Sequence, residues 1–156
     1  MQEAYGSARA AIEGAMAHPL QDYARVDASK IDNALLVEAK WSLTDFILEF
    51  EGNAFLHIRS EQNSPSWRLL ESMPEIDLPY TLGSPNFKFD WGGDLGVVES
   101  DWSRFMTDRV NKSFRTIFVN EMGVLLYFHG EEILWFQSVR HKSTGKTMLF
   151  LYSGDA

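Results

Sequence analysis

Two segments with the same pattern constrain this chain most, residues 48–60 (LEFEGNAFLHIRS) and residues 126–138 (LYFHGEEILWFQS). In each segment, apolar and other residues alternate on both sides of a glycine, and a period of two is typical of β-strands. A three-residue turn over 51–53 keeps the apolar set on one face, whereas a two-residue turn would mix Phe50 with His57. The sequence therefore predicts two antiparallel hairpins. The apolar face of the first hairpin then comprises Phe46, Leu48, Phe50, Ala54, Leu56 and Ile58.

The same reasoning predicts the environment of each hairpin. In the second, Val124, Leu126 and Phe128 share a face with Leu134 and Phe136. Its other face is also apolar, so this hairpin should lie centrally and be covered by a helix on one side. The first hairpin carries Glu49 and His57 on its other face and should lie partly exposed.

The two segments lie 78 residues apart in a chain of 156, and five of their 13 positions are identical. One interpretation is a duplicated unit, a helix followed by a meander, with a groove between the halves. The other is that two unrelated amphipathic hairpins with a glycine turn converge on one pattern. We favour the second at this point, because the distances from helix to hairpin differ between the halves.

The fold class that we expect is α+β, in one domain. A mainly antiparallel sheet of about seven or eight short strands would have one or two helices packed against it. Along the chain, the elements are a helix over 2–17, a meander over 34–71, an irregular loop over 72–99, a helix over 100–113 and a second meander over 115–152. The later helix is predicted by residues that recur at helical spacing on one face, namely Trp102, Phe105, Met106, Arg109 and Val110.

Composition excludes several classes of protein. Eleven Phe and five Trp require a core, and a net charge of −8 argues against nucleic-acid binding. The chain has no cysteine, so it has neither a disulfide framework nor a thiolate metal site. No apolar run is long enough to cross a membrane, and the acidic N-terminus lacks the basic start of a signal peptide. These features predict a cytoplasmic protein with no membrane partner.

The negative charge is concentrated in one half of the chain. Residues 1–78 contain 13 acidic and 6 basic side chains, whereas residues 79–156 contain 9 and 8. An acidic face of this kind serves solubility in many proteins. It can also steer a basic protein partner, because long-range attraction raises the association rate.

Motifs for catalysis are absent from the sequence. There is no nucleophile elbow, phosphate-binding loop or zinc-protease motif, and no histidine has another histidine or a cysteine at metal-binding spacing. We therefore predict no catalytic residue, no cofactor and no metal. His57, opposite a strand that bears Glu49, could form a carboxylate–imidazole pair used in acid–base chemistry. We favour a cross-strand polar pair on a half-exposed sheet instead.

An acid-rich loop around Trp91 is the other candidate feature. Asp90 and Asp94 flank this tryptophan, but their spacing is not that of a calcium-binding loop. Large aromatic side chains are usually buried, so Trp91 either fills the core from a loop or stands exposed as a binding anchor.

The function that we expect is a small, acidic, non-enzymatic protein-binding module with a basic protein as its partner. In physical type it is similar to the bacterial immunity-type inhibitors that cap a basic toxin, although no residue motif identifies that family. The predicted partner-binding residues are Asp45, Glu49, Glu51, His57, Asp90, Trp91 and Asp94.

Two other functions stay open at this point. One is an enzyme or ligand-binding fold with a pocket between the sheet and the 71–99 loop. That pocket would be lined by Trp91, Tyr80, Phe87 and His57. The other is a structural subunit of a homo-oligomer, such as a homodimer, with an exposed apolar edge.

Overall fold

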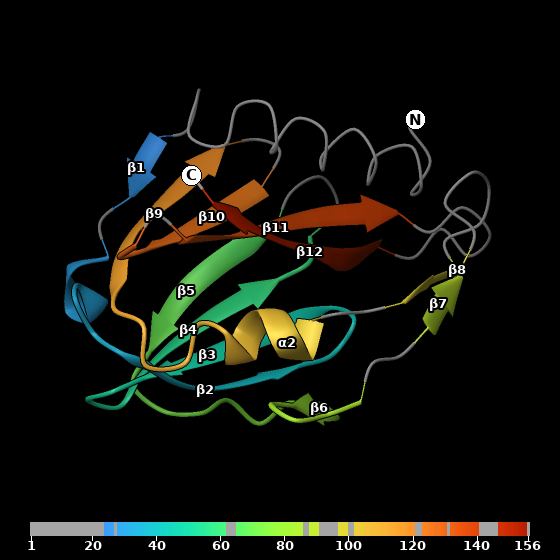
Figure 1. Ribbon diagram of the computed structural model, residues 1–156, viewed down its shortest axis with the longest axis horizontal. Coiled ribbons are helices and arrows are strands. Elements are labelled where there is room, and N and C mark those ends of the chain that lie inside the picture. The colour runs from blue at the N-terminus through green and yellow to red at the C-terminus, as the bar shows by residue number, and fades with distance from the viewer. Residues whose placement is uncertain are drawn as a thin grey trace.

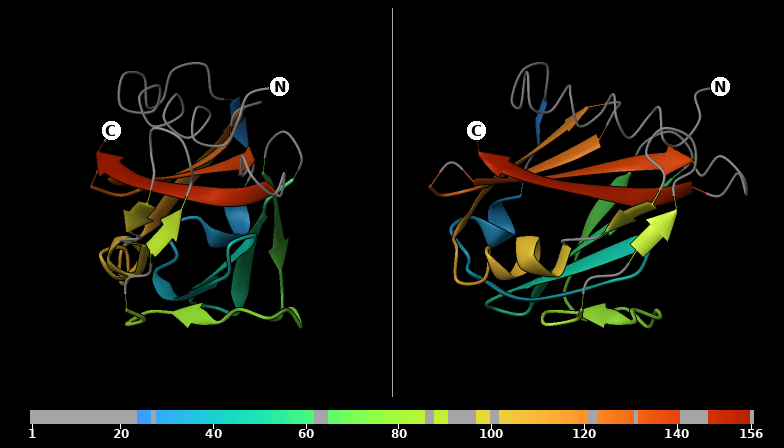
Figure 2. Two further views of the ribbon diagram at one scale, coloured as in Figure 1. Left: turned by 90° about the vertical axis from the view of Figure 1, so that its right-hand side faces the viewer. Right: turned by 45° about the vertical axis from the view of Figure 1, so that its right-hand side comes forward.

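The computed structural model describes residues 24–26, 28–61, 65–85, 88–90, 97–99, 102–120, 123–130, 132–140 and 147–155. Two five-stranded antiparallel sheets pack face to face (Figure 1). We call the sheet with the order β5-β4-β3-β2-β6 the first sheet, and the sheet with the order β1-β9-β10-β11-β12 the second sheet. Figure 2 shows them as two stacked layers, with the short helix α2 at one side between them.

Each sheet is a four-stranded meander with one extra strand at its edge. The first sheet contains β2 (Leu36–Trp41), β3 (Asp45–Phe50), β4 (Ala54–Arg59), β5 (Ser66–Leu70) and the edge strand β6 (Tyr80–Thr81). The second contains β9 (Phe114–Asn120), β10 (Gly123–Phe128), β11 (Glu132–Arg140), β12 (Thr147–Asp155) and the edge strand β1 (Ala24–Val26). The remaining elements are the 3-10 helix η1 (Ser29–Ile31), a ribbon of β7 (Lys88–Asp90) and β8 (Val97–Glu99), and α2 (Trp102–Thr107).

The antiparallel part of the expected fold is confirmed, but the arrangement of one sheet with packed helices is wrong. Because both hairpins carry an apolar face, the two sheets bury these faces against each other. The helix expected over 100–113 has six residues and is followed by turns through Asn111. It still supplies Trp102 and Met106 to the core. The helix expected over 2–17 lies outside the described residues.

The predicted register of both hairpins is confirmed. Leu48 lies opposite Leu56 in the first hairpin, and Leu126 lies opposite Leu134 in the second. Both three-residue turns need a backbone conformation with positive φ, which glycine adopts without steric cost. Gly52 and Gly130 have φ values of 85° and 93°. As predicted, β10 and β11 lie inside their sheet, with both faces buried from Leu125 to Phe128 and from Ile133 to Phe136.

The core lies between the sheets and is rich in aromatic side chains. Phe46 of the first sheet packs edge-on against Phe136 of the second, with ring centroids 5.0 Å apart. Phe50 and Phe114 form a similar contact at 5.5 Å. Edge-to-face contacts of this kind add about 0.5–1.5 kcal/mol each beyond area burial. The inner faces therefore hold the two layers together.

The halves of the chain meet around an isolated bridge between Leu35 and Ser113, which are 78 positions apart. Two hydrogen bonds flank this bridge, and moving each residue by 78 converts one into the other. They join Asn33 N to Phe114 O at 2.9 Å and Asn111 N to Leu36 O at 2.8 Å. Asn33 and Asn111 also share a positive φ, of 62° and 66°.

Other backbone contacts repeat at the same spacing. The bond from Glu51 N to Leu35 O has a counterpart from His129 N to Ser113 O, at 3.0 and 2.9 Å. The bond from Ile31 N to Ala28 O has a counterpart from Arg109 N to Met106 O, at 3.1 and 3.0 Å. From residue 28 to residue 59, the described parts of the two halves are thus related by an approximate two-fold axis. The last strand breaks the spacing, because Leu70 lies opposite Phe55 and Gly154 lies opposite Ile133, which is a spacing of 84. That the halves arose by duplication stays a prediction, which this geometry favours.

Candidate functional site

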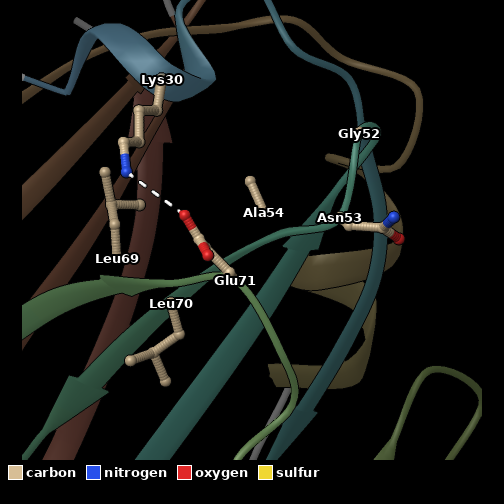
Figure 3. A pocket seen from close by; sticks show the side chains of 7 residues that line it. All are labelled: Lys30, Gly52, Asn53, Ala54, Leu69, Leu70 and Glu71. Carbon is tan, nitrogen blue, oxygen red and sulfur yellow. Dashed lines mark ion pairs between the residues drawn. The ribbon is translucent and has the colours of Figure 1, made fainter.

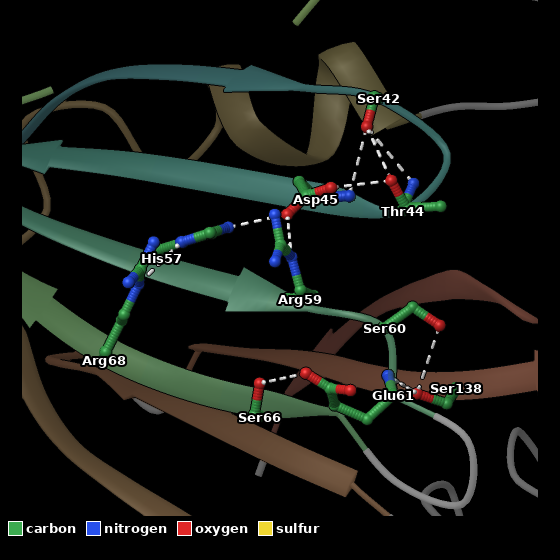
Figure 4. A network of polar contacts seen from close by, with 10 residues as sticks. All are labelled: Ser42, Thr44, Asp45, His57, Arg59, Ser60, Glu61, Ser66, Arg68 and Ser138. Atoms are coloured by element: carbon green, nitrogen blue, oxygen red, sulfur yellow. Dashed lines mark hydrogen bonds and ion pairs between the residues drawn. The ribbon is translucent and has the colours of Figure 1, made fainter. Parts of the chain in front are cut away.

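The approximate symmetry separates side chains that the fold needs from side chains that it does not. Most counterparts 78 positions apart on the inner faces are apolar, as in Leu48 and Leu126, and Ala54 with Glu132 is an exception. On the outer faces, several counterparts differ in polarity. Asp45, His57 and Arg59 of the first sheet correspond to Gly123, Trp135 and Gln137 of the second. The polar network of the first sheet is therefore the candidate site (Figure 4).

Strand pairing brings the network together. Asp45 at the start of β3 lies opposite Arg59 at the end of β4, and His57 lies opposite Arg68 on β5. Cross-strand neighbours lie on one face of a sheet, so all four side chains reach the outer side. The Ser42 hydroxyl accepts from the backbone of Asp45 at 3.1 Å and fixes the turn that precedes it.

Asp45 is the centre of this network and is only 7% exposed. Its Oδ1 accepts from His57 Nε2 at 2.7 Å and from Arg59 Nε at 2.9 Å, and its Oδ2 accepts from the Thr44 hydroxyl at 2.6 Å. Burial alone would raise the pKa of Asp45. The hydrogen bonds from Thr44, His57 and Arg59, together with the charge of Arg59, outweigh burial and hold the pKa below its usual value. Asp45 is therefore ionised at neutral pH.

His57 is 2% exposed, and both of its ring nitrogens are engaged. Its Nδ1 accepts from Arg68 Nε at 3.0 Å. Because an arginine only donates, Nδ1 carries no proton, and the proton of the neutral ring lies on Nε2, directed at Asp45. A general base needs a free nitrogen that faces its substrate. Both ring nitrogens of His57 already have partners, so the arrangement holds the ring in place and presents no free nitrogen.

Two predictions about His57 are wrong. Its carboxylate partner is Asp45, since the register places Glu49 opposite Phe55. Its side chain is also buried, although we expected it on a partly exposed face. Glu49 of the same outer face is partly exposed, as expected.

A cavity of about 150 Å³ adjoins the network. Its lining residues are His57, Arg59, Glu61, Ser66, Trp67 and Arg68. Tyr80, which we expected beside His57, belongs to β6 and pairs with Trp41 instead. Between β6 and the strand of His57 lie β2 and β3, so the two residues do not share this cavity. Trp91 and Phe87 lie outside the described residues.

The other end of the same outer face is acidic. Glu38 of β2 lies directly opposite Glu49 of β3, and both are partly exposed. Like charges in this position destabilise a sheet. Glu38 accepts hydrogen bonds from the Thr81 hydroxyl at 3.1 Å and from the Ala39 amide at 3.0 Å. Within the described part of the chain, Glu49 has no ion-pair partner.

The turn beside this acidic end carries Glu51, which is exposed and accepts from the Leu35 amide at 3.2 Å. Behind the turn lies a cavity of about 270 Å³ (Figure 3). Its lining residues are Lys30, Gly52, Asn53, Ala54, Leu69, Leu70 and Glu71. A 3.8 Å ion pair of Lys30 and Glu71 spans it, between side chains that are 70% and 91% exposed. Such exposed pairs contribute little stability.

The structure thus brings some of the predicted partner-binding residues together. Asp45 and His57 form one buried pair, and Glu49 and Glu51 lie at the acidic end of the same sheet. Asp90 belongs to β7, but its side chain, Trp91 and Asp94 lie outside the described residues. Sequence reasoning missed Arg59 and Arg68. The alternation of His57 and Arg59 on one face was a signal for the first of them.

Comparison of the chain with protein-family models, with curated proteins and with solved structures gives no match. Within the described ranges, no group of three His, Cys, Asp or Glu side chains is placed to hold a metal ion. No helix in that part of the chain is long and apolar enough to cross a membrane.

Proposed function

We propose that this protein is a non-enzymatic binding module, of the immunity-inhibitor type, that presents the acidic end of its first sheet to a basic protein partner. The observation that carries the proposal is the pair of Glu38 and Glu49 on adjacent strands. Their mutual repulsion works against the sheet, and a cation supplied by a partner would relieve it.

The position of these groups supports recognition of a partner. Glu49 and Glu51 lie at one end of β3, and Glu71 follows β5 at the same end, because Leu70 pairs with Phe55 beside the turn. The residues up to 78 also contain most of the excess acidic charge. A field of one sign over such an end raises the association rate of an oppositely charged protein.

The state of His57 supports a non-enzymatic role. It is the histidine of the first sheet, and its two nitrogens are held by Asp45 and Arg68. A second observation agrees: two cavities that described residues line beside this sheet have volumes of about 150 and 270 Å³. Sites for substrates of ordinary size have volumes of about 300–1,000 Å³.

The test is a pull-down with the double variant Glu49→Lys, Glu51→Lys and with Asp108→Lys as the matched control. Asp108 is an exposed acid in the second half of the chain. We expect the double variant to lose the partner that the wild type captures, and the control to retain it. Capture by the wild type should weaken as salt rises, because the attraction is electrostatic.

Two results would contradict the proposal. One is a double variant that retains every wild-type partner while its circular dichroism spectrum shows the native sheet content. The other is an equal loss for Asp108→Lys, since this would mean that net charge alone controls capture.

A further inference from the structure

We propose that the cavity between Arg59 and Arg68 is a binding site for an oxyanion group, a carboxylate or a phosphate. The two arginines reach it from neighbouring strands, at the end of the first sheet opposite to Glu38 and Glu49 (Figure 4). This site uses other residues than the acidic end, so it goes beyond the proposed function and does not depend on it.

Among the described residues, each guanidinium group is held in place through its Nε. Arg59 Nε donates to Asp45, and Arg68 Nε donates to His57. Within the described residues, no group accepts from the Nη atoms of either arginine. The terminal nitrogens that bind carboxylates and phosphates in forked geometry are therefore available beside the cavity.

Arg68 is the stronger indication of the two. Arg59 already has an anionic partner in Asp45, but Arg68 donates to a neutral imidazole and forms no ion pair with any described residue. A positioned cation without a counter-ion, in a chain of net charge −8, fits a role in binding an external anion. Because its side chain is already oriented by His57, little ordering is required when an anion binds.

The volume of the cavity and a third hydrogen-bond donor, the Ser66 hydroxyl, fit one small oxyanion group. A cavity of about 150 Å³ has room for a phosphate or a carboxylate with a short chain. The Ser66 hydroxyl at its border now donates to Glu61 at 3.2 Å and could donate to a bound oxygen instead. The site thus combines two arginine forks and a hydroxyl, which is a typical set of donors for oxyanions.

Two carboxylates oppose an anion here, and they act differently. The oxygens of Asp45 are already occupied by Thr44, His57 and Arg59. Glu61 is exposed at the border, so its charge must turn away when an anion enters. Removal of that charge should therefore strengthen binding, a direction that a purely structural role of Arg59 and Arg68 does not predict.

The experiment is an NMR titration of the arginine Nε–Hε signals with inorganic phosphate and, separately, with acetate, at constant ionic strength. We expect saturable shifts of the Arg59 and Arg68 signals. Arg68→Lys keeps a charge and a donor for His57 but loses the fork, and should weaken binding about tenfold. Glu61→Gln should strengthen it about threefold.

Arg115→Lys is the matched control, because Arg115 is an exposed arginine of the second sheet that stacks on Tyr127. It should leave the affinity unchanged. Binding of phosphate without binding of acetate would assign a phosphate group to the site, and binding of acetate without phosphate would assign a carboxylate. Either result supports the site.

To distinguish a free ligand from a partner, a short peptide is added with its C-terminus either free or amidated. Tighter binding of the free-acid form than of acetate assigns a protein terminus, and equal binding assigns a free anion. Shifts that do not saturate, or that are as large for Arg115 as for Arg68, would overturn the proposal. A Glu61→Gln variant that binds no better than the wild type would also count against it. The Glu49→Lys, Glu51→Lys variant should bind the anion normally, so failure of one proposal is separable from failure of the other.

Discussion

The two sheets of this protein share a backbone plan and differ in what they expose. Each sheet has an extra strand beside the first strand of its meander, the first three meander strands share one register, and the turn hydrogen bonds repeat at a spacing of 78. Yet the position of His57 in the first sheet is occupied by Trp135 in the second, which is buried. The fold can therefore be built without the polar network.

Near the helical turns the second half, and not the first, carries the polar side chain. Arg109 of the second half is 4% exposed and donates to the Ile133 carbonyl at 2.9 Å and to the Ser153 hydroxyl at 2.6 Å. Its counterpart Ile31 lies in the apolar core. The second half thus buries a polar group that the first half replaces by an alkyl chain, while the first half has its polar groups on the outer face.

The prediction with the largest expected effect tests whether equivalent core residues of the two halves contribute equally to the free energy of unfolding. Leu48→Ala and Leu126→Ala each remove a fully buried side chain at equivalent positions. We expect each to lower the free energy of unfolding by about 2–5 kcal/mol, and the two losses to agree within about 1 kcal/mol. Urea unfolding followed by circular dichroism measures both. A loss at one site less than half of that at the other would break the comparison.

The second prediction uses two glycines with different roles. A Cβ on Gly123 would overlap the backbone oxygen of Phe136, whereas a Cβ on Gly52 meets open space. Gly123→Ala should therefore destabilise the protein by about 1–3 kcal/mol through overpacking. Gly52→Ala should cost about 1 kcal/mol, because its φ of 85° strains an L-residue. Thermal unfolding of the two variants checks this order, and a larger cost at Gly52 would contradict it.

The third prediction tests whether Asp45 stabilises the first sheet. Asp45→Asn leaves Arg59 without its carboxylate, and we expect a loss of about 1.5–3 kcal/mol at pH 7. The pKa of Asp45 is lower in the folded state than its unfolded value of about 3.9. Its ionisation therefore stabilises the fold above that value, and this contribution is lost as the pH falls through the folded pKa.

The measurement is urea unfolding of the wild type and of Asp45→Asn from pH 7 to pH 2. The difference between them should stay constant down to about pH 4 and then shrink. As a control, Asp108→Asn should show a small difference over the whole range, since Asp108 is exposed. A difference for Asp45→Asn that grows on acidification would have the wrong sign and exclude the proposed role of the carboxylate.

Much of the first sheet could be predicted from the sequence, because its determinants are local. The period of two and the glycine turn determine which residues share a face, so the pairing of Leu48 with Leu56 followed directly. The layering could not be predicted in this way. Nothing local says that β1 and β6 each join the sheet whose meander lies in the other half of the chain. Pairings of this kind depend on the packing of the whole core.

The candidate site shows the same limit. The sequence predicts both Asp45 and His57 as site residues, but it predicts Glu49 as the partner of the histidine. The alternation of apolar and polar residues shows which side chains share a face of the sheet. It does not show which residue of the neighbouring strand lies nearest to His57, because that depends on the strand register and on the length of each side chain. Arg68 lies on β5, and the hairpin pattern does not constrain the connection from β4 to β5. The hydrogen bond from Arg68 to His57 therefore could not be predicted from the sequence.

The smallest expected effect concerns the ion pairs at equivalent corners of the two halves. Ala54 of the first half corresponds to Glu132, which lies 3.9 Å from both Lys112 and Arg109. Where the second half is filled by this cluster, the first half has the larger cavity and the exposed pair of Lys30 and Glu71.

We expect Lys112→Gln to cost about 0.5 kcal/mol and Lys30→Gln to cost about 0.2 kcal/mol or less in the free energy of unfolding. Urea unfolding in low salt and in 1 M salt separates the two. Screening should abolish the small Lys30→Gln effect, because that pair is exposed, and should leave part of the Lys112→Gln effect, because Glu132 is more buried. A Lys30→Gln loss equal to that of Lys112→Gln would show that the exposed pair stabilises its corner as much as the partly buried cluster does, and the corners would then no longer differ in stability.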